Sequence, residues 1–158
     1  MAGAGARPEV PHLPGARVLV VEARFYDFIN DLLLEGARAA LAAAEAEITH
    51  LAVPGALEIP PAIALALAEG GFDAFVALGC VIRGETSHYD LVAGESCRGL
   101  MELGIRHGAA IGNGILTVEN EAQALDRADP HGQDKGGGAA CAALSLLTWR
   151  RRLGAKVT

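Results

Sequence analysis

Residues 79–90, with the sequence GCVIRGETSHYD, carry the side chains best suited to chemistry. They follow a short apolar run and lead into a helical pattern. Gly84, Glu85 and Thr86 can offer backbone amides and a hydroxyl to an anion, and the partial positive charge of a helix start favours the same ligand. An ordinary turn that caps the helix through Thr86 or Ser87 fits the composition as well. The residues alone leave an anion site and a capped turn both open.

His88 stands where this loop joins the helix, beside the candidate anion site. Imidazole exchanges protons near neutral pH, so a histidine here suits general acid–base catalysis, with a purely structural histidine as the alternative. The remaining histidines form no metal-ligand spacing with it; they are His12, His50, His107 and His131. The sequence therefore predicts no metal site.

Three charged residues elsewhere are further candidates for ligand binding. Arg127 and Lys135 flank a loop at residues 129–134, where they either neutralise a phosphate or are ordinary surface charges. Glu58 begins a helical pattern, where it either favours the helix dipole or accepts hydrogen bonds from a polyol. No G-x-G-x-x-G or Walker motif follows the first strand, which counts against dinucleotides and nucleoside triphosphates.

Hydrophobic periodicity predicts strands that alternate with helices. The strands are expected at residues 17–23, 48–53, 72–78 and 109–117, the last interrupted at residues 112–114. The helices are expected at residues 27–46, 58–69, 88–106, 120–128 and 136–153. This alternation is typical of a parallel, doubly wound α/β sheet, whose ligands bind beyond the carboxyl ends of the strands. The loops at residues 25–28, 54–58, 80–88 and 113–114 should therefore build the site.

Length and composition bound the remaining possibilities. The 158 residues suit one domain, with an Ala-, Gly- and Pro-rich flexible arm at residues 1–16 and a single α/β domain at residues 17–158. A net charge of −6 gives no drive toward nucleic acid or an anionic membrane. Cys80, Cys97 and Cys141 lack a C-x-x-C spacing, so buried free thiols are expected. With no membrane-length apolar run and no signal peptide pattern, the cytoplasm is the expected location.

Six blocks together resemble the 6,7-dimethyl-8-ribityllumazine synthase family over residues 18–149. They are RF and DFI within residues 24–29, VPGALEIP at 53–60, GCVIRGETSHYD at 79–90, GILTVEN at 114–120 with QA at 123–124, RA at 127–128, and KG at 135–136. The resemblance implies a flavodoxin-like three-layer fold with a four-stranded parallel sheet of order 2-1-3-4. It implies a transferase that condenses 5-amino-6-ribitylamino-pyrimidinedione with 3,4-dihydroxy-2-butanone 4-phosphate, without a metal or organic cofactor.

The same resemblance implies roles for individual residues. Phe25 would stack on the pyrimidinedione ring and Glu58 would bond the ribityl hydroxyls. The rest of that pocket would be Ala56, Leu57, Val81 and Ile82, the last two acting through backbone groups. Phosphate would be bound by the loop residues Gly84, Glu85 and Thr86, and His88 would transfer protons.

The family's active site lies between neighbours in a homopentamer, so further residues would come from the adjoining subunit. Arg127 would pair with phosphate, Lys135 would support that pocket and Asn113 would face the substrate. Residues 129–133 lack the Gly-Thr-Lys-x-Gly pattern associated with sixty-subunit capsids. The implied assembly is therefore a free pentamer, with a decamer as the alternative.

Two departures from the family bear on ligand affinity. Leu57 and Asn113 stand where many members carry phenylalanine, so the implied pocket is less aromatic. A non-catalytic flavin- or lumazine-binding pentamer is the alternative reading. The intact set of Phe25, Glu58, Thr86, His88 and Arg127 argues against that alternative. A flavodoxin-like electron carrier would need a phosphate loop after the first strand, and residues 24–27 are a poor match for one.

Overall fold

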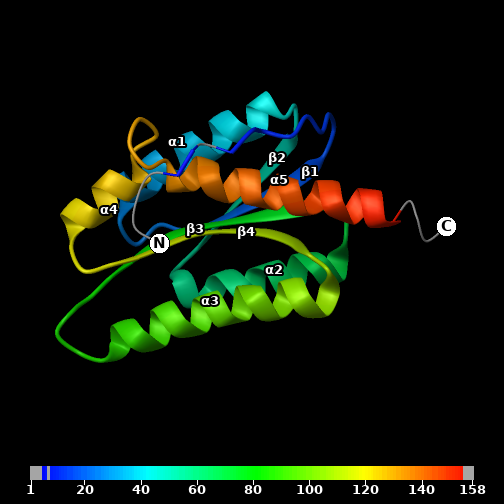
Figure 1. Ribbon diagram of the computed structural model, residues 1–158. Coiled ribbons are helices and arrows are strands. Elements are labelled where there is room, and N and C mark those ends of the chain that lie inside the picture. The colour runs from blue at the N-terminus through cyan, green and yellow to red at the C-terminus, as the bar shows by residue number, and fades with distance from the viewer. Residues whose placement is uncertain (1–4, 7, 155–158) are drawn as a thin grey trace.

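The computed structural model describes residues 5–6 and 8–154. The elements, in chain order, are β1 (Arg17–Ala23), α1 (Asp27–Ala43), β2 (Glu47–Val53), the short 3-10 helix η1 (Ala56–Glu58), α2 (Ile59–Glu69), β3 (Ala74–Ile82), α3 (His88–His107), β4 (Ala110–Val118), α4 (Glu121–Ala128) and α5 (Lys135–Gly154). The strands form one parallel four-stranded sheet of order β2-β1-β3-β4. Helices cover both of its faces (Figure 1), which confirms the predicted flavodoxin-like three-layer fold.

Alternate residues of the central strands enter two separate cores. In β1, Val18 and Val20 pack with residues of α1 and α5, whereas Leu19 and Val21 pack with residues of α2 and α3. Figure 1 shows the same division, with α1, α4 and α5 on one face of the sheet and α2 and α3 on the other. Because both faces are covered, β1 is buried almost throughout, as is usual for a strand inside a parallel sheet.

α1 ends at Ala43 rather than at the predicted residue 46. Glu45 adopts a left-handed conformation with φ 60°. The amide of Ala46 donates to the carbonyl of Leu41, and that of Glu45 to the carbonyl of Ala42, each at 3.0 Å. This pair of bonds is a Schellman motif, which usually contains a glycine at the left-handed position. The prediction was wrong here because a glutamate takes that position.

The predicted break at residues 112–114 is also wrong, since β4 is continuous. A Cβ atom on Gly112 would lie 1.8 Å from the carbonyl oxygen of Ala139 in α5. The glycine therefore permits the close approach of a helix to the strand and does not mark a turn. Asn113 alternates to the opposite face, where its Nδ2 lies 3.4 Å from the Sγ of Cys97.

β3 extends past the predicted residue 78 to Ile82, so Cys80 and Val81 lie in a strand and not in a loop. These three residues pair in parallel register with Leu116, Thr117 and Val118 of β4. The longer β4 supplies hydrogen-bonding partners for the additional residues, a long-range effect that local periodicity does not contain. The connection between β3 and α3 shrinks to residues 83–87.

The segment before β1 is fastened to the end of α1 where the structure describes it. The amides of Leu13 and Gly15 donate to the carbonyls of Ala44 and Glu45, each at 3.0 Å. His12 forms an ion pair with Glu45, and Leu13 packs against the core. Residues 1–4 and 7 of the predicted arm lie outside the described residues, and the boundary after residue 16 stays a prediction.

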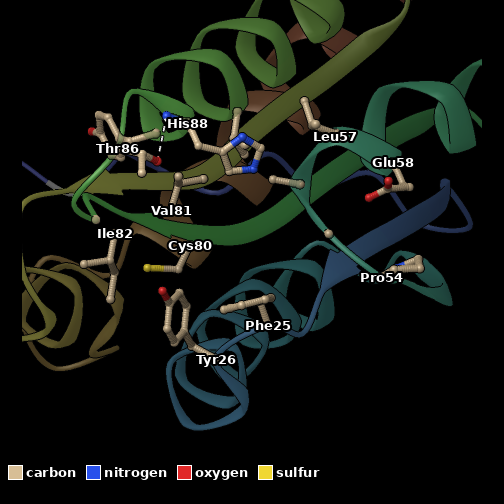
Figure 2. A pocket seen from close by; sticks show the side chains of 15 residues that line it. Phe25, Tyr26, Pro54, Leu57, Glu58, Cys80, Val81, Ile82, Thr86 and His88 are labelled. Atoms are coloured by element: carbon tan, nitrogen blue, oxygen red, sulfur yellow. Dashed lines mark hydrogen bonds between the residues drawn. The ribbon is translucent and has the colours of Figure 1, made fainter.

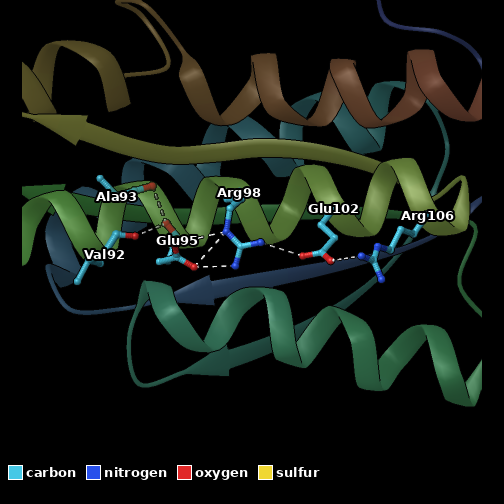
Figure 3. Close-up of polar contacts among 7 residues, drawn as sticks. Val92, Ala93, Glu95, Arg98, Glu102 and Arg106 are labelled. Atoms are coloured by element: carbon cyan, nitrogen blue, oxygen red, sulfur yellow. Dashed lines mark hydrogen bonds and ion pairs between the residues drawn. The ribbon is translucent and has the colours of Figure 1, made fainter.

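α3 carries a ladder of charges on its exposed face. Glu95, Arg98, Glu102 and Arg106 are linked in that order by ion pairs of 2.7 to 3.0 Å (Figure 3). On the buried side, the hydroxyl of Ser96 donates to the carbonyl of Val92 at 2.7 Å. Of the helices in residues 5–6 and 8–154, none combines the length and the apolar character needed to cross a bilayer.

Candidate active site

Three loops that follow β1, β2 and β3 enclose a cavity of about 480 Å³ at the carboxyl edge of the sheet (Figure 2). It lies where the rule for parallel sheets predicted a ligand site. The lining residues are Phe25, Tyr26, Pro54, Gly55, Ala56, Leu57, Glu58, Cys80, Val81, Ile82, Gly84, Thr86, His88, Tyr89 and Val92. Apolar side chains predominate and a few polar groups converge, which is typical of a small-molecule site.

The predicted site residues fall into two groups. The cavity brings together Phe25, Ala56, Leu57, Glu58, Val81, Ile82, Gly84, Thr86 and His88. Glu85 belongs to the same loop but is not among the residues that line the cavity. Asn113, Arg127 and Lys135, which were expected to serve a neighbouring subunit, do not line the cavity of their own chain.

The loop after β1 supplies an aromatic wall. Phe25 is 73% exposed, and its ring meets that of Tyr26 edge to face, with 5.0 Å between centroids. Tyr26 lies opposite Cys80 (Figure 2). Burial, followed by the neighbouring Cys80, raises the pKa of the Tyr26 hydroxyl. Burial also raises the pKa of the Cys80 thiol to about 11, so this sulfur is a poor nucleophile near neutral pH.

The loop after β2 places a carboxylate at the opposite side. Glu58 ends the 3-10 turn η1, which Pro54 and Gly55 precede. A Cβ atom on Gly55 would lie 3.0 Å from the Oε2 of Glu58, so the carboxylate folds back over its own turn. Pro60 and Pro61 follow in the first turn of α2, as predicted, where their missing amides break no hydrogen bond. An exposed carboxylate of this kind can accept hydrogen bonds from hydroxyl groups.

The loop after β3 presents Gly84, Thr86 and His88. His88 is the first residue of α3, and its amide donates to the Oγ1 of Thr86 at 3.3 Å. The imidazole of His88 projects over the cavity between Val81 and Leu57 (Figure 2). The loop therefore places an imidazole, a hydroxyl and a helix start around one space. The hydroxyl and the helix start suit an anionic group, and the imidazole suits proton transfer next to it.

Arg83 anchors this loop to the end of β4. Its amide donates to the carbonyl of Val118 at 2.9 Å, and its Nε donates to Glu119 at 2.9 Å. The guanidinium also approaches Asp90 and lies 4.2 Å from the centroid of the Tyr89 ring. The hydrogen bond to Glu119 is the main reason that the pKa of Arg83 is raised. Its charge is thus balanced by carboxylates.

The predicted site residues outside the cavity lie on β4, α4 and α5. Asn113 lies in the middle of β4, paired with Ala77, and its Oδ1 accepts from the amide of Ile115 at 2.9 Å. The predicted site loop at residues 113–114 is therefore wrong. Arg127 is in the last turn of α4, where its Nη1 donates to the carbonyl of Gln123 at 3.1 Å. Lys135 begins α5 and lines a second cavity of about 510 Å³ beside α1.

Sequence reasoning missed several lining residues: Tyr26, Pro54, Gly55, Cys80, Tyr89 and Val92. The first four lie inside segments that were predicted as loops that build the site, so their positions carried a usable signal. Val92 follows His88 by one helical turn and shares its face, which helical spacing reveals. Cys80 was expected in the site loop at residues 80–88, whereas the structure places it in the extended strand β3, which forms part of the wall.

The electrostatics of the cavity are one-sided. Of the residues that line it in the described part of the chain, none is a lysine or an arginine, and Glu58 adds a negative charge. Arg83 is adjacent in sequence to Gly84 but is engaged with Glu119 and Asp90. The site of one chain can therefore offer hydrogen bonds to a phosphate group but no free cation from its own walls.

Comparison with known proteins gives the family. Residues 15–151 match the family model for 6,7-dimethyl-8-ribityllumazine synthase. The chain belongs to this family. A 6,7-dimethyl-8-ribityllumazine synthase of Methylobacterium radiotolerans is 60% identical over 95% of this chain and 92% of its own length. Proteins of the same name from Erythrobacter litoralis and Novosphingobium aromaticivorans are 62% and 63% identical, over 89% and 87% of this chain and 99% and 98% of theirs. Membership confirms the resemblance inferred from the six sequence blocks.

Proposed function

We propose that the cavity is one half of an active site that condenses 5-amino-6-ribitylamino-pyrimidinedione with 3,4-dihydroxy-2-butanone 4-phosphate. Membership of the family makes the chain a transferase of riboflavin biosynthesis that acts at the penultimate step. The products are 6,7-dimethyl-8-ribityllumazine, phosphate and water. A neighbouring subunit supplies the other half of the site.

The walls after β1 and β2 receive the pyrimidinedione. Phe25 stacks on the ring, and the exposed Glu58 carboxylate accepts hydrogen bonds from the ribityl hydroxyls. Ala56 and Leu57 complete the pocket, and backbone groups of Val81 and Ile82 bind the edge of the ring. The strand geometry of these last two residues supports this role, because their backbone lies in an ordered ladder at the rim of the cavity.

The loop after β3 receives the ketose phosphate. Gly84, Glu85 and Thr86 bind the phosphate beside the start of α3, and His88 moves protons. An amine of the pyrimidinedione attacks the ketone, and loss of water gives an imine. Removal of a proton then expels phosphate, and the second amine closes the ring with loss of a further water. Holding both reactants together supplies several kcal/mol of the barrier, and no step requires an oxidant or a reductant.

The charge of the cavity is the observation that carries the proposal of a shared site. A phosphate leaving group needs a cation, and the lining of the described chain offers none, while Glu58 opposes an anion. Arg127 and Lys135 of the adjoining subunit provide the missing positive charge, and Asn113 of that subunit faces the substrate. Arg127 is suited to this role because its side chain has no ion pair among the described residues and is held only by the carbonyl of Gln123.

Exposed apolar side chains support a homo-oligomer. Leu91, Met101 and Ile105 of α3 are 60%, 63% and 75% exposed, beside the charged ladder of the same helix. Leu65 of α2 adds a further exposed side chain at 71%. Large apolar residues gathered on two neighbouring helices are typical of a subunit interface. We infer a homopentamer that acts in the cytoplasm, with a decamer of two pentamers as the alternative.

The direct test mixes the purified protein with both substrates. Formation of the lumazine is followed by its absorbance and fluorescence, phosphate release is measured in parallel, and native mass spectrometry gives the assembly mass. Product and phosphate in equal amounts from a pentamer are expected. Protein that binds lumazine or riboflavin but forms no product would instead identify a non-catalytic relative. Reactions that lack one substrate provide the baseline.

A further inference from the structure

Arg24 joins the end of β1 to the beginning of α1. Its guanidinium forms ion pairs with Glu22, Asp27 and Asp31. It donates to the Oδ1 of Asp27 at 3.0 Å and to the carbonyl of the same residue at 3.2 Å. The pKa of Arg24 is raised mainly by its hydrogen bond to Asp31 and next by its hydrogen bond to Glu22, with a smaller contribution from Asp27. One side chain therefore spans the whole β1–α1 connection.

The inner end of this bridge is rigid. Glu22 is fully buried within the apolar run of β1, where an unpaired carboxylate is costly. Its second oxygen lies 2.9 Å from the Nε2 of His50 on β2. Arg24 thus holds one oxygen of the buried carboxylate, while the other oxygen has no hydrogen-bond partner among the described residues and lies beside the His50 ring.

The outer end holds a helix start that has no other side-chain cap. Tyr26 occupies the N-cap position of α1 and makes no capping hydrogen bond through its side chain. Asp27 and Asp31 lie in the first two turns, on the side that the guanidinium reaches. A planar guanidinium with five donors suits a bridge of this kind, whereas a lysine ammonium does not span several carboxylates.

Phe25 lies between the two ends. Its ring is 73% exposed, so core packing does not determine where it stands. Its contact with Tyr26 is edge to face, which leaves a face of the ring free toward the cavity. The position of this ring is consequently set by the backbone of the connection that Arg24 clamps.

We propose that Arg24 is a positioning residue that fixes Phe25 for stacking and thereby sets affinity for the flat heterocyclic substrate. This inference rests on the proposed function, in which Phe25 stacks on the pyrimidinedione. Arg24 acts through Phe25 and touches neither substrate. It therefore governs recognition of the heterocycle, and the ketose phosphate is bound independently of it.

The test removes the outer end of the bridge and leaves the buried pair intact. In the double variant Asp27→Asn/Asp31→Asn, Arg24 keeps Glu22 but loses both helix carboxylates. Arg24→Lys keeps the positive charge beside Glu22 but lacks the planar guanidinium that reaches several carboxylates. Glu35→Gln is the matched control, because Glu35 is an exposed carboxylate on the same helix that is not in this bridge. Steady-state constants are measured for each substrate at saturating concentrations of the other.

The KM for the pyrimidinedione should rise about three- to tenfold in both bridge variants, the range expected for loss of an aromatic stack. In the bridge variants, the KM for the ketose phosphate and the kcat should equal those of the unsubstituted protein. In Glu35→Gln, all of these constants should equal those of the unsubstituted protein. In a Phe25→Ala background, the double substitution should have no additional effect, because the two changes act through the same contact.

Two results would overturn the inference. One is an undiminished effect of Asp27→Asn/Asp31→Asn in the Phe25→Ala background, which would mean that the bridge acts on something other than the ring. The other is a change confined to the ketose phosphate, which would mean a long-range effect of charge. If the unsubstituted protein forms no lumazine, the proposed function fails first, and that outcome is distinct from both.

Discussion

A site shared by two subunits predicts that two different impaired variants restore each other. His88→Ala removes the proton-transfer group and leaves Arg127 in place, whereas Arg127→Ala does the reverse. Loss of a positioned histidine should slow turnover by about 10²- to 10⁴-fold. Loss of a charge-assisted hydrogen bond to phosphate costs about 1.5–3 kcal/mol, or about 10- to 150-fold in kcat/KM for the ketose phosphate.

The size of the recovery follows from ring symmetry. In the proposed ring, each site would take its β3–α3 loop from one subunit and its guanidinium from the next, and every subunit would contribute once to each of two sites. When the two variants mix at random in equal amounts, a site is complete if its first subunit carries Arg127→Ala and its second carries His88→Ala. That combination occurs with probability one half times one half, so about a quarter of the sites should have full activity.

The assay co-expresses the two chains with different masses and determines the subunit ratio by native mass spectrometry. Rates are measured with ketose phosphate well below its KM, where the rate is proportional to kcat/KM, the constant that both single substitutions should lower. Co-expression of His88→Ala with the unsubstituted chain is the control and should retain about half of the activity, since only one subunit per site needs the imidazole. A mixed oligomer whose rate equals the average of the two homo-oligomers would refute a shared site.

Three further predictions concern single residues. Gly112→Ala should lower the free energy of unfolding by about 3 kcal/mol, because its Cβ would lie 1.8 Å from the Ala139 carbonyl oxygen. Gly138→Ala, on the same helix as Ala139 but with open space around its Cβ, should raise the free energy of unfolding by about 0.5–1 kcal/mol. Urea unfolding at matched protein concentration measures both changes, and changes of the same sign would contradict the packing argument. The Cys80 thiol, whose pKa is raised from 9.0 to about 11, should be alkylated slowly at pH 9, with a rate that is still increasing at pH 11, where about half of the thiol is ionised. Mass spectrometry of iodoacetamide-treated protein can follow this rate, and a half-maximal rate near pH 9 would mean an ordinary thiol. Glu58→Gln should raise the KM for the pyrimidinedione by about tenfold or more, because hydrogen bonds to a charged acceptor are lost, and the difference should disappear for an analogue without ribityl hydroxyls if the assigned role is correct.

Much of the site could be predicted because its parts are local in sequence. A parallel sheet places its ligand at the carboxyl ends of the strands, so a loop such as residues 83–87 is marked by the apolar run before it and the helical pattern after it. His88 was located by this reasoning alone. Pro60 and Pro61 likewise have a local explanation, since a first helical turn tolerates them.

Apart from the end of α1, where a glutamate adopts the left-handed conformation, the errors share one physical cause, which is contact between segments distant in sequence. Gly112 has the appearance of a turn residue, but it is required by the approach of α5 to β4, and only the fold brings Ala139 beside it. The extension of β3 to Ile82 depends on hydrogen bonds from β4. The bridge through Arg24 shows the same limit, because nothing in the run RVLVVEA indicates that its buried Glu22 meets both Arg24 and His50.

The order of the sheet agrees with the proposal that the imidazole and the guanidinium of one site come from two chains. His88 begins α3, which packs on the same face of the sheet as α2. Arg127 lies in the last turn of α4, which packs with α1 and α5 on the opposite face (Figure 1). Within one chain, Arg127 does not line the cavity that contains His88. In a ring of subunits, the face that carries α4 in one subunit can border the loop edge of the next. The cavity at the β3–α3 loop is lined by no lysine or arginine of its own described chain, which supports the proposal that a neighbour supplies the cation.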